Sequence, residues 1–512
     1  MVKRWLSRLF RAKRSYDGAG YSRRTSGWLT RSTGPNAEIA PSLSKLRDRH
    51  RDLVRNNPWA GRAVQAVVNN AVGYGIQAQW ADPARTDLWR RWFESTACDA
   101  DGRADGYGLQ SLALRTIVES GEVLIRRRPR RLEDGFPVPL QLQILEPDYL
   151  DHAKTEPTPS GGWITQGVEF NPLGQRIAYW LYPEHPGDQT RLLPQTSVRY
   201  SAADFLHVYR VDRPGQSRGV PWGAGVMLRL KMLDDYADAQ LERQRLAACY
   251  VAFVRDTETP TDVADEYSLF DKLMPGAVEI LPPGKDVSFA SPPAAEGYRD
   301  YLITVLQSVA AGYGVPYETL TGDLSQVNFS SARMGWNEFA RNIDVWRWHM
   351  LIPQFLNPMA RWFDDAAGLI GNASQPLPEW TPPARVMVDP TREIPAIQSA
   401  IRCGLLTLPE AIRQQGYDPD TLIAEQAAFL QKLDALGIKL DCDPRQSTSA
   451  LPRRPLKTRL RMSDRTRHNR PKSHETDSPA PDPTGQIQAA QRRYRDSHHR
   501  SRVEFRRGSE TL

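Results

Sequence analysis

The sequence predicts a mixed α+β fold in which helices and strands occupy separate stretches of the chain. Helical periodicity runs through residues 43–120, and strand patterns follow in residues 121–182. Proline and glycine account for 40 and 35 of the 512 residues, which indicates more turns than a plain helical bundle needs. Apolar residues make up 40% and charged residues 25%, as in globular proteins, so most of the chain is expected to fold, into roughly three structural units.

The basic residues gather at the two ends of the chain. Residues 1–55 carry 14 Lys and Arg against 4 Asp and Glu, and residues 451–512 carry 16 against 7, which leaves the body between them acidic. Of the 67 basic residues 56 are Arg, whose planar guanidinium suits phosphate contacts, although genome base composition explains an Arg preference equally well. The ends are predicted to be a flexible arm and a disordered tail.

The first residues, MVKRWLSRLFRAKR, combine Trp5, Leu6, Leu9 and Phe10 with six basic side chains. This pattern fits a basic amphipathic helix, and an arm that docks on a partner is favoured over a helix on a membrane surface. No apolar run approaches 18 residues, so no membrane span is expected. The four cysteines lie far apart with no zinc-binding spacing, which predicts reduced thiols: they are Cys98, Cys249, Cys403 and Cys442.

Helices are expected first along the chain. Apolar spacing of three to four predicts a helix over 43–54, which Asn57 and Pro58 interrupt before a second helix over 59–72. Two more helical stretches are expected near 84–95 and 108–120. Strands follow at 121–128 and 140–146, and a hairpin is expected between 163–170 and 176–182.

The second half of the chain alternates long helices with short strands. The expected elements are a helix at about 224–249, strands at 251–254 and 277–281, an amphipathic helix from Tyr298, a long helix at 331–350, and helices near 391–403, 408–415 and 419–436. Only a narrow stripe of the 224–249 helix is apolar, so much of its surface must face water, charge or a neighbouring subunit. Pro353 and Pro358 are expected to kink or interrupt the chain after the 331–350 helix.

Motifs for enzyme chemistry are mostly missing. Pro283 to Asp286 resembles the end of a phosphate-binding loop but lacks its glycine spacing and its hydroxyl residue, which favours a turn. The stretch LEPDYLDH (145–152) holds four potential metal ligands, although a solvated turn after a strand is favoured. His207 alternates with apolar neighbours and is interpreted as a hydrogen-bonded histidine of a sheet. No cofactor and no metal are therefore expected.

Five long blocks are more specific than any short motif. They are RIAYWLYPEHPGD (176–188), DFLHVYRVDRPGQSRGVPWG (204–223), LDDYADAQLERQRLAACYVAFV (233–254), PGAVEILPPGKDV (275–287) and VAAGYGVPYETLTGDLSQVNFSSAR (309–333). In this order and spacing they resemble the lambda-type portal proteins of tailed bacteriophages. The resemblance covers roughly residues 40–440 and leaves out both basic ends.

The resemblance implies a portal fold made of a β-containing wing, a stem of two long helices, a small α/β clip between them and a helical crown. Fitted to the pattern above, the expected parts are a basic flexible arm 1–39, wing 40–222, first stem helix 223–250, clip 251–330, second stem helix 331–352, tunnel segment 353–390, crown helices 391–442 and basic disordered tail 443–512.

The implied function is that of a ring, a dodecamer in the virion, at one vertex of the capsid. Double-stranded DNA is packaged and ejected through its channel. The implied partners are other copies of the chain, the DNA, the terminase large subunit, capsid and scaffold or protease proteins, and head-tail connector proteins, with no membrane. The protein is expected in the virion, and in the host cytoplasm during assembly. It is not expected to be an enzyme, because the terminase supplies the ATPase.

The resemblance places the narrowest part of the channel just after the 331–350 helix. Gln354 and Asn357 are the candidates there, since neutral polar side chains can touch phosphate without trapping it. Arg341 and Arg347 lie one to three turns earlier and could guide DNA. The alternative is that Pro353 kinks a buried helix and that both polar side chains bond to neighbours.

Two other classes of protein remain possible from the residues alone. A DNA-processing enzyme would use the carboxylates of LEPDYLDH, and a basic nucleic-acid scaffold would depend on residues 1–55 and 451–512. Neither class explains the five blocks.

Overall fold

The computed structural model describes residues 23–440 and 443–445, except 24, 29, 189–195, 249–251, 257–284, 290–296, 326, 386 and 388. The chain divides into two compact units, Met1–Ala435 and Leu436–Leu512, and nearly all the described residues belong to the first. Several predictions lie outside the described residues: the arm up to residue 22, the strand at 277–281, the tail from residue 446, and the thiols of Cys249 and Cys442.

A layer of helices forms the first part of the chain, as expected. These helices are α2 (Pro35–Ile39), α3 (Leu43–Asn56), α4 (Pro58–Ala71), α5 (Pro83–Phe93) and α6 (Gly106–Ser120). The predicted break between α3 and α4 is confirmed, because the Asn57 side chain accepts hydrogen bonds from the backbone N–H groups of Trp59 and Ala60 and so caps α4. Pro58 fits the first turn, where a backbone N–H is not needed.

A three-stranded antiparallel sheet in the order β3-β2-β9 packs against these helices. Its strands are β2 (Glu122–Pro129), β3 (Leu140–Leu145) and β9 (Phe205–Tyr209). The pairing of β2 with β3 confirms the expected strands at 121–128 and 140–146. Helix α6 ends at Gly121, and β2 begins at the next residue, so one turn connects the helical layer to the sheet.

A five-stranded sheet lies beside it, and here one prediction is wrong. Its strands are β4 (Glu156–Pro157), β5 (Trp163–Thr165), β6 (Val168–Phe170), β7 (Arg176–Leu181) and β8 (Val198–Ser201). The expected single strand over 163–170 is split, because Gln166 and Gly167 have φ angles of 51° and 81° and turn β5 back onto β6. The expected hairpin partner is confirmed, since β6 pairs with β7.

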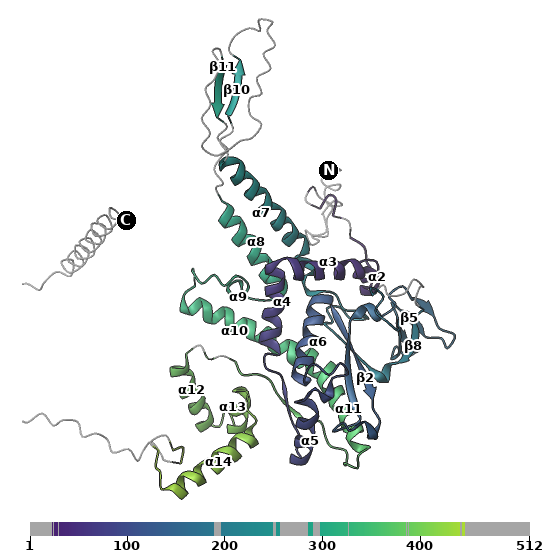
Figure 1. The fold of residues 1–512 in the computed structure, drawn as a ribbon, viewed down its shortest axis with the longest axis vertical. Helices are drawn as coiled ribbons and strands as arrows, with labels where there is room; N and C mark the ends of the chain where they lie inside the picture. The colour runs from purple at the N-terminus through teal and green to yellow at the C-terminus, as the bar shows by residue number, and fades with distance from the viewer. Residues whose placement is uncertain are drawn as a thin grey trace, which may run out of the picture. The chain divides into compact units, whose positions relative to one another are not determined.

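Two helices run side by side beyond the sheets (Figure 1), α7 (Met227–Ala248) and α8 (Tyr298–Tyr313). The ring of Tyr236 packs on those of Tyr298 and Tyr301, with centroids 5.7 and 4.8 Å apart. The strands β10 (Ala252–Asp256) and β11 (Lys285–Phe289) pair antiparallel between these helices in the sequence. The α7 helix confirms the expected helix near 224–249, and Lys285 opens a strand where a turn was expected.

The long helix near 331–350 does not end where the sequence suggests. After α9 (Tyr317–Thr321), α10 (Phe329–Trp346) continues into a π-helix, η7 (Arg347–Leu356), and then into α11 (Asn357–Gly368). The N–H of Asn357 donates to the carbonyl of Ile352, five residues back. Proline disrupts the hydrogen bonding of an α-helix, in which each N–H donates to the carbonyl four residues back. In the wider π-helical turn the helix continues through Pro353.

The last helices fall where they were expected: α12 (Pro390–Arg402), α13 (Leu408–Gln414) and α14 (Pro419–Leu436). Before them, the chain crosses back to pair β12 (Glu379–Thr381) with β1 (Gln77–Gln79). Short 3-10 helices complete the described elements: η2 (Thr96–Cys98), η3 (Leu132–Asp134), η4 (Pro147–Tyr149), η5 (Ala202–Asp204) and η6 (Trp222–Gly225).

The main hydrophobic core joins the helical layer, the β3-β2-β9 sheet and the α10–α11 helix. Its densest part is a cluster of aromatic rings centred on Trp89, which contacts Trp80, Trp92, Phe93, Phe363 and Trp380. Within the described part of the chain no helix is long and apolar enough to cross a membrane. Cys98 is a buried free thiol and Cys403 an exposed one, as predicted for these two.

Candidate functional site

The four residues predicted at the channel lie along the helix from α10 to α11, and three of them bond inside the subunit. Arg341 is exposed on α10. Arg347 is 4% exposed, and its Nε and Nη2 donate to the carbonyls of Ala71 and Asn70 at 2.7 and 2.9 Å. Burial lowers the pKa of Arg347 to about 10. The guanidinium therefore caps the C-terminal end of α4, where the helix dipole favours a positive charge.

Gln354 and Asn357 are half-buried and hold the helix to two strands. The Gln354 side-chain oxygen accepts the backbone N–H of Tyr209 in β9 at 3.2 Å. The Asn357 side-chain oxygen accepts the indole N–H of Trp380 in β12 at 2.7 Å. Within one subunit this matches the alternative in which a proline-containing helix is buried and its polar side chains bond to neighbours. Their place in a channel stays a prediction, since it concerns the assembled ring.

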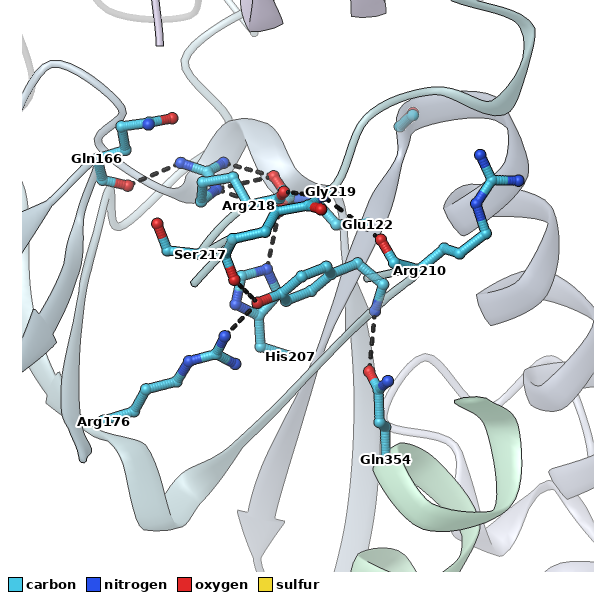
Figure 2. A network of polar contacts seen from close by, with 12 residues as sticks. Glu122, Gln166, Arg176, His207, Arg210, Ser217, Arg218, Gly219 and Gln354 are labelled. Carbon is cyan, nitrogen blue, oxygen red and sulfur yellow. Dashed lines mark hydrogen bonds and ion pairs between the residues drawn. The ribbon is translucent and has the colours of Figure 1, made fainter. Parts of the chain in front are cut away.

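A second set of polar residues meets at the Glu122 side chain, which is completely buried. Arg218 donates to both carboxylate oxygens at 2.6 to 3.1 Å, and Arg47 donates to one at 3.0 Å. The backbone N–H of Gly219 and the Nε2 of His207 complete the set at 2.7 and 2.8 Å. Figure 2 shows His207, Arg218 and Gly219 converging on Glu122. Burial alone would raise the pKa of Glu122, but these neighbours outweigh burial and hold its pKa far below the ordinary value.

This arrangement fixes the loop from Arg210 to Gly219 on the sheet. The Tyr209 hydroxyl donates to the Gln216 carbonyl at 2.8 Å and accepts a hydrogen bond from Arg176, while the Arg218 Nη1 donates to the Gln166 carbonyl at 2.7 Å. Gly219 cannot carry a side chain, because a Cβ would lie 2.2 Å from the Gly121 carbonyl oxygen. The sequence reasoning missed this cluster. Its signal is an acidic residue, Glu122, directly before the three buried apolar residues that open β2, Val123, Leu124 and Ile125.

The interpretation of His207 as a hydrogen-bonded histidine of a sheet is confirmed. Its ring lies in β9 and bonds to Glu122. Burial lowers the pKa of His207 to about 4, so the ring is neutral at pH 7. A neutral imidazole adds no charge beside the two guanidinium groups.

A second buried histidine links α8 to the helical layer. The Nδ1 of His50 donates to the Glu119 carbonyl, and the Tyr313 hydroxyl donates to Nε2, both at 2.6 Å. Gly223 packs directly on this pair, since a Cβ there would lie 2.3 Å from each of the two bonded atoms, the His50 Nε2 and the Tyr313 hydroxyl oxygen. These contacts of His50 therefore hold both α8 and the segment that leads into α7 against the helical layer.

The carboxylates of the possible metal cluster in LEPDYLDH form ion pairs with arginine side chains. Of the four potential ligands in this stretch, Glu146 and Asp148 come together, and the third member of the group is His185 from outside it, with one ligand atom from each residue within 4.8 Å of the others. However, Arg51 Nη2 binds Asp148 at 2.6 Å and Glu146 at 3.0 Å. Burial opposes ionisation of Asp148, but Arg47 and Arg51 lower its pKa. The favoured turn is confirmed as η4, and the charge that a cation would supply comes from guanidinium groups.

Comparison with known proteins identifies the family of this chain. Residues 21–347 match the family described as "Phage portal protein, lambda family". The chain belongs to this family. The match includes all five sequence blocks, α7, α8 and the Glu122 cluster, and it ends before Gln354, Asn357 and α12–α14.

The relatives of this portal protein are distant but extend over most of its length. It is 26% identical to the "Probable portal protein" of Halomonas phage phiHAP-1, over 83% of this chain and 88% of that protein. It is 23% identical to "Portal protein B" of Escherichia phage lambda, over 82% and 90%. The protein is a phage portal protein and not an enzyme, which confirms two expectations drawn from the five blocks.

Among solved structures, the subunit is similar to chains from the necks of gene transfer agent (GTA) particles. One comes from a native neck computed with C12 symmetry, with a TM-score of 0.45 at 16% identity over 76% of this chain and 95% of that one. Another comes from an empty-particle neck computed with C6 symmetry, with a TM-score of 0.47 at 17% identity over 77% and 98%.

Proposed function

We propose that this portal protein forms the ring-shaped channel at the capsid vertex through which double-stranded DNA is packaged and ejected. Membership of the lambda portal family carries this proposal. The ring would be a dodecamer, and it would dock the terminase large subunit, capsid and scaffold or protease proteins, and head-tail connector proteins. The chain would then act in the virion, and in the host cytoplasm during assembly.

We further propose that α7 and α8 are the two stem helices, with β10 and β11 in the clip between them. The expectation from sequence gave the second stem position to residues 331–352. The contacts of Tyr236 with Tyr298 and Tyr301 favour α8, because they pair the two helices that flank the strands. The wing is then the part with the two sheets and the helices α2–α6, and the crown is α12–α14.

Exposed apolar side chains support assembly into a ring. On α7, a helix of 22 residues, the long apolar side chains of Leu228 and Met232 are 73% and 66% exposed. A closed ring repeats one heterologous contact, so each subunit must offer two different faces to its neighbours. The outward side of α7 is a candidate for one of them.

The channel role of Arg341, Arg347, Gln354 and Asn357 remains part of this proposal. Arg341 is the first to test because its side chain is exposed and free to reach a DNA phosphate. Arg341→Ala is expected to change DNA packaging while the ring assembles normally. A useful control is Arg333→Ala, an exposed arginine two turns earlier on the same helix.

Negative-stain electron microscopy of the purified protein tests the proposal as a whole. Rings with a central hole are expected, and particles that stay monomeric at all concentrations and in the presence of capsid proteins would contradict it. The stem assignment has its own test. Crosslinks between cysteines placed at Leu228 and on the neighbouring copy's α7 or α8 should form in the ring. Their complete absence would contradict the assignment of α7 and α8 as the stem helices.

A further inference from the structure

A groove of about 830 Å³ lies between the π-helix η7, the segment that leads from β12 to α12, and α13. Apolar side chains line it: Trp348, Ile352, Leu377, Trp380, Met387 and Ile397. Trp348 is 51% exposed, although tryptophan side chains are on average highly buried in folded proteins. None of the residues of α12, on one side of the groove, is buried, although the helix carries Ile394, Ile397 and Ile401. A concave apolar surface of this size is typical of a binding site.

The rim of the groove is acidic. Four carboxylates line it, those of Asp344, Glu379, Glu393 and Glu410. Arg413 is shared by Glu379 and Glu410, and Arg385 pairs with Asp344. The third arginine of the lining, Arg347, is buried and bonded to the end of α4, and its Nη1 lies 3.9 Å from Asp344. The carboxylates at the rim therefore outnumber the guanidinium groups that face them, which favours a basic occupant.

One segment of this chain matches both properties. Residues 3–14 carry six basic side chains and no acidic one, and their apolar residues are Trp5, Leu6, Leu9 and Phe10. Spacings of one, three and one place these four on one face of a helix. An amphipathic helix whose apolar face enters a groove is a common mode of peptide recognition.

The arm is also long enough to reach. Asn36 is fixed to the rest of the subunit, since its side chain accepts from Ser217 and donates to the Gly215 carbonyl. The Thr33 carbonyl also accepts a hydrogen bond from Arg213, and the backbone N–H of Trp28 donates to the Thr25 carbonyl in a turn. The stretch from Arg14 to Thr25 can span about 36 Å when extended. This exceeds the radius of gyration of about 21 Å expected for a compact domain of 400 residues.

We propose that this groove binds the N-terminal arm of the same chain. The apolar face of residues 5–10 would cover Trp348 and its neighbours, and the basic residues would face Glu379, Glu393 and Glu410. The proposal does not depend on the ring, because groove and arm belong to one chain. It assigns a partner to a segment that lies before the matched family region.

Limited proteolysis of the full chain gives the first test. Trypsin cuts after Arg8, Arg11 and Lys13, and mass spectrometry can follow these cuts over time. Trp348→Asp is expected to speed them about tenfold, since one central aromatic contact often dominates such an interface. Leu173→Asp is the matched control, because Leu173 is 83% exposed in the turn between β6 and β7, away from the groove. Equal rates in all three chains would overturn the proposal.

A peptide in trans gives the second test. A labelled peptide of residues 1–16 is titrated by fluorescence anisotropy against the chain lacking residues 1–20. Binding is expected to weaken about tenfold with Trp348→Asp, and several-fold with the double change Glu379→Gln and Glu410→Gln or with 0.5 M salt. A scrambled peptide of the same composition should bind poorly, and equal binding of the scrambled peptide would overturn the proposal, because charge alone would then explain it.

Other occupants of the groove and other places for the arm have distinct signatures. Arm protection that persists in Trp348→Asp would show that a surface other than this groove holds the arm. Protection removed by nuclease would assign the arm to nucleic acid. A peptide that binds vesicles containing phosphatidylserine but not the protein would assign it to a membrane surface. Each of these results contradicts the proposal, and unchanged circular dichroism of the variants excludes misfolding as the cause.

Discussion

The proposed wing and the proposed crown bury their side chains in opposite ways. In the wing, α4 alone buries seven residues, and Trp89, Trp92 and Phe93 of α5 are at most 1% exposed. In the crown, α12 buries none, and α14 buries Pro419 and Leu433 out of 18 residues. An isolated helix of this length is marginal in water, so we expect the helices of the proposed crown to gain further contacts on assembly. The proposed wing is buried by its own core, whereas most side chains of α12 and α14 are not buried in the single subunit.

Charges follow the same division. Glu122, Arg218 and His207 have no exposed side-chain surface, and each carboxylate oxygen is fully bonded. On α13 of the proposed crown, Arg413 pairs with Glu379 of β12 and with Glu410, whose side chains are 65% and 48% exposed. A buried charge that loses its partner costs much more than an exposed one. Variants of the two regions should therefore differ in stability by amounts that are easy to measure.

The largest effect is expected at the buried carboxylate. Glu122→Ala leaves Arg218 and Arg47 buried without their partner, at a cost of about 3–5 kcal/mol in the free energy of unfolding. Glu410→Ala, the crown control, should change it by less than about 0.5 kcal/mol. Urea denaturation measures both. Similar losses in the two variants would show that the regions do not differ as described.

The next effect is a pH dependence confined to the wing. Burial lowers the pKa of His207 to about 4, against about 6.5 in an unfolded chain. As pH falls below 6.5 the unfolded state binds a proton that the folded state refuses, so stability falls, by ~2 kcal/mol between pH 7 and pH 5. His207→Gln keeps a donor for Glu122 and should lose this share of the pH slope, while His50 contributes equally in both chains. Equal slopes in wild type and variant would contradict it.

A smaller effect is expected where the π-helix meets the sheet. Gln354→Ala removes the acceptor of the Tyr209 backbone N–H and should cost about 1–2 kcal/mol, whereas Gln354→Glu keeps an acceptor and should retain most of the stability. Thermal unfolding and DNA packaging are measured together. If Gln354→Ala kept full stability but lost packaging, the side chain would act at the channel and not at the wing.

The smallest effect on the subunit is expected in the crown. Phe429 is 53% exposed on α14, so Phe429→Ser should change the stability of the dissociated subunit by less than about 0.5 kcal/mol. The yield of rings, counted by microscopy or mass photometry, should nevertheless fall. A normal yield of rings would mean that this face of α14 is not covered on assembly.

The sequence by itself determined the elements whose signals are local. Asn57 and Pro58 predicted the break between α3 and α4 because capping and proline geometry act within one turn. Apolar spacing located α7 and α12–α14, and five linked blocks indicated the family. Those features depend on neighbours a few residues apart or on the order of residues.

Only the tertiary structure decided what depends on distant partners. Glu122, Arg218 and Arg47 come together from β2, a loop and α3, and no spacing in the sequence relates them. The ring of Tyr236 packs on those of Tyr298 and Tyr301 and so pairs α7 with α8, a contact that no spacing in the sequence indicates. Pro353 remained inside a helix because Arg347, Gln354 and Asn357 hold that helix to α4, β9 and β12. A local rule fails there because packing and hydrogen bonds from elsewhere in the fold outweigh the preference of one residue.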